Sequence, residues 1–230
     1  TVISLHAKLL APYTQHWVHL NHQFRMQADD SLISWINHFT GDRILLPLQK
    51  SFRHHYDFRI FSDAEEMRQA IVSQNKRLGL ARIVSTTGYP STLDGGQHFI
   101  TEGRFKLPWD QYNYTSTPWA EIPQTINEVG SIYTCQGFDL NYVGLILGPV
   151  VKLSSDGQKI EIDTSKITDV ESFKHRTDMA DPQEILNAKI QLNLNAINVL
   201  MKRGVKGLYL FAHDPALRTR LYSEYQIINH

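Results

Sequence analysis

Apolar residues recur at helical spacing after Asp181-Pro182, and this is the strongest pattern in the chain. They lie three or four residues apart, at Leu186, Ile190, Leu194, Ile197 and Met201. This spacing places them on one face of a helix. Asp181 can cap the amino end, Pro182 suits the first helical position, and Gly204 provides the stop. We therefore predict a long amphipathic helix that ends before Gly204.

Three further segments carry helix-start signals, at residues 29–31, 62–65 and 214–215. The first is acidic and can cap a helix that Gly41 would end. In the second, Ser62 stands three residues before Glu65, which is the capping-box pattern for a helix reaching about Asn75. In the third, an Asp-Pro pair begins a last helix near the end of the chain.

Short apolar runs between these helices predict strands, at residues 58–61, 80–85, 129–134, 142–147 and 208–212. The run at 142–147 is continuous and is closed by Gly148-Pro149, which is typical of a strand buried on both faces. The order strand, helix, strand over residues 58–85 predicts a βαβ unit with a parallel pair of strands. The sequence therefore predicts an α/β fold with a mostly parallel sheet.

Length and composition favour one core domain over residues 1–230. With 42% hydrophobic and 20% charged residues, the chain has the composition of a globular protein and is long enough for one large α/β domain or two small ones. Residues 86–124 are rich in Gly, Pro, Thr and aromatic residues without periodicity, so we predict an irregular insertion there. Residues at about 154–180 are predicted to be a mobile segment, with a polar, hairpin-like stretch around Asp156-Gly157.

The charge balance narrows the function classes. Twenty-three basic residues balance twenty-three acidic ones, so contact with nucleic acid would need a local basic patch rather than a global field. The single cysteine, Cys135, excludes an intrachain disulfide and a cysteine zinc cage, which suits the cytoplasm. We see no signal peptide and no apolar run near the ~18 residues of a membrane span. The chain opens at Thr1 without Met, which we interpret as a piece of a longer protein.

Three short segments place polar or cationic groups at the ends of apolar elements. The first is Gln23-Phe24-Arg25, where an arginine beside a helix start can offer its guanidinium fork to a phosphate. A surface ion pair would explain the same arginine. Three nearby histidines, His16, His19 and His22, have no carboxylate or thiolate partner beside them, so we predict no metal site there.

The second segment is residues 132–139, where an apolar strand meets a glycine-containing turn and a second strand follows. Ligands gather at strand ends in open α/β sheets. Gly137 permits close backbone approach, Gln136 and Thr134 can hydrogen-bond a phosphate or a neighbouring motif, and Asp139 can accept from a ribose hydroxyl. An ordinary turn with a capping aspartate is the alternative.

The third segment, residues 202–207, follows the strongest predicted helix. Its cations complement the helix dipole, which alone would account for one of them. Arg203 stands at the corner between helix and strand, where an arginine finger can stabilise charge on a γ-phosphate. No glycine-rich stretch is followed by Lys-Ser or Lys-Thr, so the chain has no P-loop, and we expect it to be inactive as an ATPase by itself.

Taken together, these segments resemble the C-terminal half of the bacterial P-loop ATPases of the Schlafen group 3-like DNA/RNA helicase family, which are related to superfamily 1 helicases. The resemblance spans nearly the whole chain and is carried by residues 20–25 with Trp35, 57–61, 105–109 with 119–120, 130–149 and 198–211. It implies a RecA-like three-layer α/β/α fold, namely the second helicase lobe.

The resemblance also implies roles for individual residues. Residues 23–25 look like helicase motif IV, 134–140 like motif V and 199–206 like motif VI. Arg25 and Arg203 would then contact the γ-phosphate and Asp139 would lie near the ribose. Thr134 with Gln136 would couple the nucleotide to the nucleic acid.

One position departs from the family pattern, and several parts of such an enzyme lie outside this chain. Lys202 stands where family members usually have threonine, which removes a hydroxyl beside Arg203. ATP and Mg²⁺ would be bound mainly by an N-terminal RecA-like lobe of the same protein, upstream of Thr1.

Two functions follow from this interpretation. In the first, the chain is a motor lobe that moves along single-stranded DNA or RNA, gripping bases with aromatic side chains. Candidate grips are Tyr89, Trp109, Tyr112, Tyr114 and Trp119. These aromatics can equally well cover a hydrophobic core. In the second, the chain belongs to an ATP-gated module that binds nucleic acid or protein without unwinding, for example in phage defence.

Overall fold

A five-stranded, all-parallel sheet forms the centre of the computed structural model, which describes residues 14, 25–90, 96–111, 113–168 and 181–229. Its strands are β1 (Asp57–Ile60), β2 (Ala81–Ser85), β5 (Val129–Gly130), β6 (Leu140–Leu147) and β9 (Gly204–Ala212). They lie in the order β1-β9-β6-β2-β5. The predicted α/β fold with a parallel sheet is therefore confirmed.

The two central strands, β6 and β9, are apolar because both of their faces are covered. Val143 and Leu145 point to one hydrophobic core, whereas Tyr142 and Ile146 point to the other. Side chains alternate between the faces of a strand, so a strand between two layers has no solvent face and reads as a continuous apolar run.

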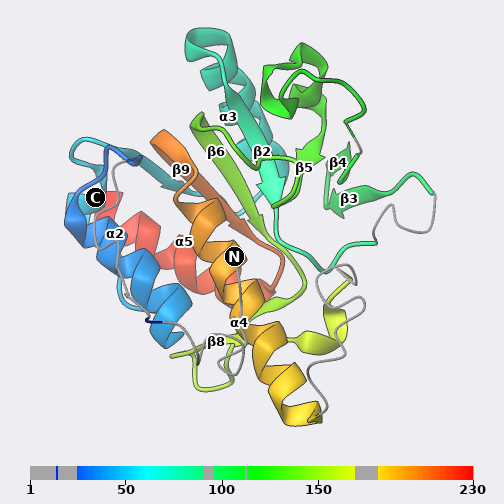
Figure 1. Ribbon diagram of the computed structural model, residues 1–230. Helices are drawn as coiled ribbons and strands as arrows, with labels where there is room; N and C mark the ends of the chain where they lie inside the picture. Colours follow the sequence, from blue (N-terminus) through cyan, green and yellow to red (C-terminus); the bar gives the residue numbers. More distant parts are fainter. Residues whose placement is uncertain (1–13, 15–24, 91–95, 112, 169–180, 230) are drawn as a thin grey trace.

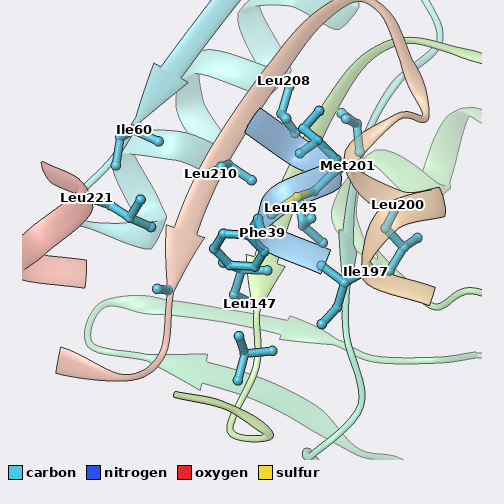
Figure 2. Packing of buried hydrophobic residues seen from close by; sticks show 14 of the residues in the cluster. Phe39, Ile60, Leu145, Leu147, Ile197, Leu200, Met201, Leu208, Leu210 and Leu221 are labelled. Atoms are coloured by element: carbon cyan, nitrogen blue, oxygen red, sulfur yellow. The ribbon is translucent and has the colours of Figure 1, made fainter. Parts of the chain in front are cut away.

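Three helices cover one face of the sheet (Figure 1). They are α2 (Asp30–Asn37), which continues into a π-helical turn (His38–Asp42), α4 (Pro182–Met201) and α5 (Pro215–Asn229). Figure 2 shows how Phe39, Leu145 and Leu210 gather between these helices and the strands. Asp181 accepts a hydrogen bond of 3.0 Å from the backbone of Gln183 and so caps α4 as predicted.

The opposite face carries α3 (Ala64–Leu78) and a β-hairpin formed by β3 (Phe99–Glu102) and β4 (Phe105–Pro108). The hairpin lies within residues 86–124, which we expected to be irregular. Two short 3-10 helices, Trp119–Glu121 and Pro123–Asn127, complete that region. Helices on one face and α3 on the other make a three-layer α/β/α architecture.

A second hairpin and a 3-10 turn lie after β6. The hairpin pairs β7 (Val151–Leu153) with β8 (Ile160–Ile162), and the 3-10 turn covers Thr164–Lys166. The hairpin and the 3-10 turn together cover the first part of the segment expected to be mobile, whereas residues 169–180 lie outside the described residues. Another 3-10 turn, Lys50–Arg53, precedes β1. Of the helices described, none is long and apolar enough to cross a membrane.

The structure corrects three local expectations. β1 and β2 are parallel, but β9 and β6 lie between them, so the two strands of the predicted βαβ unit do not pair with each other. Asp63, not Ser62, caps α3, because its carboxylate accepts from the backbone of Glu65 and Glu66. Residues 131–134 form a turn rather than the second half of a strand.

Candidate functional site

Arg25 and Asp139 form an ion pair between two segments that are 114 residues apart. Arg25 precedes α2, and its Nε donates to Oδ1 of Asp139, which directly precedes β6. Both side chains remain accessible, with 38% and 50% of their surface exposed. The segment of Arg25 is anchored nearby, because the Gln27 backbone donates a 2.9 Å hydrogen bond to the Val205 carbonyl in β9.

Arg203 lies next to this pair, at the corner between α4 and β9. It is only 6% exposed, and its Nη1 donates a 3.1 Å hydrogen bond to the carbonyl oxygen of Phe138. Its Nε is also buried and has no hydrogen-bond partner among the described residues. A buried guanidinium N–H without a partner is costly, so this donor suits an acceptor supplied from outside.

The segment between β5 and β6, residues 131–139, is called the β5–β6 loop below. Its beginning is closed on itself, because the backbone of Ser131 donates to Oγ1 of Thr134 at 2.7 Å and that hydroxyl donates back to the Ser131 carbonyl at 3.2 Å. Gly130 is required here, since a Cβ would lie 2.6 Å from the same hydroxyl oxygen. The Thr134 hydroxyl is therefore used inside the loop.

The apex of the β5–β6 loop carries Gln136 and Gly137, both exposed. Gly137 has a φ of 95°, a conformation that favours glycine, and a side chain at this position would meet no neighbour within 4 Å. These two predicted site residues thus lie at the surface beside Asp139, where the backbone is open to an approaching ligand.

Cys135 belongs to the same loop, with its side chain packed in the hydrophobic core, and sequence reasoning did not include it in the site. Its thiol is fully buried, and burial raises its pKa, while the nearby charge of Arg203 acts in the opposite direction. Nothing in the sequence pattern distinguishes this cysteine from any small core residue. Its value is as a reporter of the loop, because it is the sole cysteine of the chain.

The cluster lies at the amino ends of the parallel strands, which corrects one argument for it. Leu140 begins β6, Gly204 begins β9, and the two residues are paired in the sheet. In open α/β sheets ligands bind at the carboxyl ends of the strands. That general rule therefore gives no support to this site, which rests on the convergence of Arg25, Asp139 and Arg203.

Three of the five candidate base-stacking residues, Tyr89, Trp109 and Trp119, are buried. Trp109 and Trp119 are each 3% exposed, and Trp119 donates a 3.1 Å hydrogen bond to Glu128. A base cannot stack on a ring whose faces are already covered, so the burial favours the core role. Tyr112 lies outside the described residues. Tyr114 is 91% exposed and Tyr89 is buried.

Lys202 points away from the cluster. Its ammonium donates a 2.6 Å hydrogen bond to the side-chain oxygen of Asn37 on α2, and burial lowers its pKa. Asn198 adds a contact to the π-helical turn after α2, through Thr40 at 2.7 Å. The lysine therefore joins α4 to α2 rather than contacting Arg203.

The remaining predicted residues, Gln23 and Phe24, fall outside the described part of the chain. Across the described residues, no three His, Cys, Asp or Glu side chains come together as a possible metal site.

The sequence profile described as Schlafen group 3, DNA/RNA helicase domain, matches residues 3–214. A protein of Saccharomyces cerevisiae named "Uncharacterized protein YPL245W" is 34% identical over 225 residues, which cover 92% of this chain and 49% of the yeast protein. The chain thus spans about half the length of that relative, and the similarity extends beyond bacterial ATPases. No solved structure matches the chain.

Proposed function

Because this chain belongs to the Schlafen group 3 DNA/RNA helicase domain family, we propose that it is the second motor lobe of an ATP-dependent DNA or RNA helicase or translocase. In this role it contributes Arg25, the β5–β6 loop and Arg203 to an ATP site shared with an N-terminal lobe. That lobe would provide the phosphate cradle and the Mg²⁺ ligands, because this chain has no P-loop.

The observation that carries the proposal is the meeting of three distant segments at one point. The segment before α2, the β5–β6 loop and the α4–β9 corner are joined by the Arg25–Asp139 ion pair and by the bond from Arg203 to Phe138. The family resemblance assigned these same segments to motifs IV, V and VI. A shared catalytic role gives a reason for that convergence, which sequence spacing alone does not.

The two arginines fit an anionic ligand. Arg25 and Arg203 bring two positive charges against the single negative charge of Asp139, and Arg203 retains a buried Nε donor without a described partner. ATP would supply a phosphoryl group whose oxygens gain negative charge during transfer. Guanidinium groups held in place stabilise such charge without reorganising.

The other motif V residues take supporting roles in this proposal. Gln136 lies on the exposed apex of the loop, where it can contact nucleic acid or the other lobe. Thr134 acts by holding the start of the loop, because its hydroxyl is bonded to Ser131. Asp139 can turn to a ribose hydroxyl once it is released from Arg25.

The test is ATP hydrolysis by the full-length parent protein, with and without single-stranded DNA and RNA. Arg203→Ala should abolish the nucleic-acid-stimulated turnover while ATP still binds. Arg203→Lys keeps the charge but removes the fork, and should recover only a minor part of the rate. Unchanged turnover in Arg203→Ala would refute the assignment.

Controls are needed because Arg203 is buried. Thermal unfolding of each variant separates loss of catalysis from loss of the fold. Arg220→Gln is the matched control, since Arg220 is an exposed arginine paired with Glu224 on α5. Its turnover should equal that of the wild type.

The burial of Trp109 and Trp119 favours a second candidate function, an ATP-gated module that binds nucleic acid or protein without unwinding. Of the predicted base-stacking grips that the structure describes, Tyr114 alone is exposed, which leaves few rings for a motor to hold bases with. Strand-separation assays decide between the two functions. ATP-dependent binding without strand separation would support the module, and unwinding would support the motor.

A further inference from the structure

The end of the β5–β6 loop is held by two arginines. The start of the loop is fixed by the bonds between Ser131 and Thr134. Its last residues are held by Arg25, through the Asp139 carboxylate, and by Arg203, through the Phe138 carbonyl. Gly137 lies between the two ends with an open surrounding and a left-handed backbone. The loop therefore has a start held by its own hydrogen bonds, a glycine at its centre, and an end that depends on contacts with two arginine side chains.

The group that holds Arg25 resembles the ligand proposed for it. A carboxylate and a phosphate both accept paired hydrogen bonds from a guanidinium, so Asp139 occupies the position that an anionic ligand would need. A terminal phosphate carries about two negative charges where the carboxylate carries one. A terminal phosphate can therefore compete with Asp139 for Arg25.

We propose that Asp139 is an internal competitor of the nucleotide's terminal phosphate and keeps the β5–β6 loop closed over Arg203 until that phosphate arrives. This inference rests on the proposed function, since it assigns regulation to the same site. When Asp139 releases Arg25, the loop moves about Gly137, and the buried Nε of Arg203 becomes accessible. Empty protein thus holds its arginine finger covered, while a terminal phosphate uncovers it.

Cys135 allows this movement to be measured without a label. It is the only cysteine in the chain, and as a residue of the loop its side chain is fully buried against the core. Its rate of alkylation by iodoacetamide is followed by mass spectrometry across a range of pH. The pH dependence separates loop opening from changes in the pKa of the thiol, which burial raises and the charges of Arg203 and Arg25 lower. The experiment uses this 230-residue chain and inorganic tripolyphosphate as the probe.

Asp139→Asn should accelerate alkylation of Cys135 roughly two- to fivefold, the range expected for loss of an exposed ion pair. In the wild type, tripolyphosphate should accelerate it more than NaCl of equal ionic strength. Arg25→Gln should also accelerate alkylation, because it removes the other partner. A wild-type rate in Asp139→Asn, or no response of the wild type to tripolyphosphate, would overturn the proposal.

Binding affinity separates competition from simple loosening of the loop. Asp139→Asn should bind tripolyphosphate more tightly than the wild type, whereas Arg25→Gln should bind it more weakly. Weaker binding by both variants would contradict competition. Asp42→Asn is the matched control, because it removes an exposed carboxylate paired with His38 in the π-helical turn after α2. Its alkylation rate and its affinity should stay at wild-type values.

The two proposals can fail separately. If Asp139→Asn leaves Cys135 unreactive while Arg203→Ala abolishes ATP hydrolysis in the parent, the internal competitor is wrong and the motor lobe stands. If alkylation responds as expected but the parent shows no ATP hydrolysis, the competition is correct and the motor function is wrong. The melting temperature of each variant is measured as a control, because faster alkylation in a variant that stays folded cannot come from global unfolding.

Discussion

Gly204 and Gly207 approach each other so closely at the start of β9 that a Cβ on Gly204 would lie 2.1 Å from the carbonyl oxygen of Gly207. The sheet register is irregular here, between the Leu140–Gly204 and Tyr142–Gly207 pairs. The irregularity is a backbone feature that sets the position of Arg203 at the adjoining corner. Gly204 is therefore needed for close packing, and not only as the helix stop predicted from the sequence.

Gly204→Ala should destabilise the protein by about 1–3 kcal/mol, because the new methyl group meets backbone that cannot move aside without breaking sheet pairing. For a chain of this size the melting temperature should fall by roughly 2–4 °C per kcal/mol. Calorimetry measures the shift. Gly41→Ala is the control, since a Cβ there would meet nothing within 4 Å, and its melting temperature should equal or slightly exceed that of the wild type.

Trp119→Ala should lower the free energy of unfolding by about 3–5 kcal/mol, because it leaves a cavity beside Gly130 and an unpaired Glu128. Tyr114→Ala should leave stability unchanged, since Tyr114 is 91% exposed. Urea unfolding checks both. If Trp119→Phe keeps its stability but loses affinity for single-stranded DNA or RNA, Trp119 has the base-stacking role after all.

Lys202→Thr tests the departure from the family pattern. It should cost about 0.5–1.5 kcal/mol through the lost hydrogen bond to Asn37. ATP hydrolysis by the parent should be unchanged, because Lys202 is directed to α2 and not to Arg203. A clear gain in turnover would instead mean that the missing hydroxyl had limited the wild-type protein.

Asp163→Asn should show a pH-dependent loss of stability. Hydrogen bonds from Lys152 and Ser165 lower the pKa of Asp163 from 3.8 to about 2. Because the pKa of the folded state is lowered, the stabilisation is present above pH 4 and disappears as the pH falls toward 2. The wild type should therefore melt above the variant at pH 7, and the difference should shrink below pH 4. Glu161→Gln, on the same hairpin, controls for net charge.

The elements that could be predicted from the sequence are those with strong local signals. α4 has a capping aspartate, a first-turn proline and regular apolar spacing, and it begins at Pro182 as expected. β6 is a buried run closed by glycine and proline. Local signals suffice in these cases because both elements are determined by residues close together in the chain.

Strand order and the β3–β4 hairpin could not be predicted in the same way. Two apolar runs joined by a helix indicate a parallel sheet, yet they do not reveal that β9 and β6 enter between β1 and β2. In the hairpin, Ile100, Phe105 and Leu107 are buried around a turn at Gly103, which has a φ of 59°. This alternation was present in the sequence but was obscured by the surrounding Gly, Pro and Thr residues.

The site was predicted as three segments, without their contacts. Arg25, Asp139 and Arg203 were each selected for chemistry, but no spacing rule connects residues 114 positions apart. For the two tryptophans, only burial distinguishes the alternatives, because a tryptophan in a polar segment can either bind a ligand at the surface or belong to the core. Trp109 and Trp119 look alike at the sequence level and are placed in the interior only by tertiary packing.

The central sheet tapers from its middle to its edges. β6 and β9 run for eight and nine residues, whereas the outer strands β1 and β5 have four and two. Unpaired backbone groups on an outer strand are a template onto which another chain can add. Edges this short offer a neighbouring molecule few hydrogen bonds, so when lobes or subunits meet, they should do so through side chains rather than through a continuous sheet.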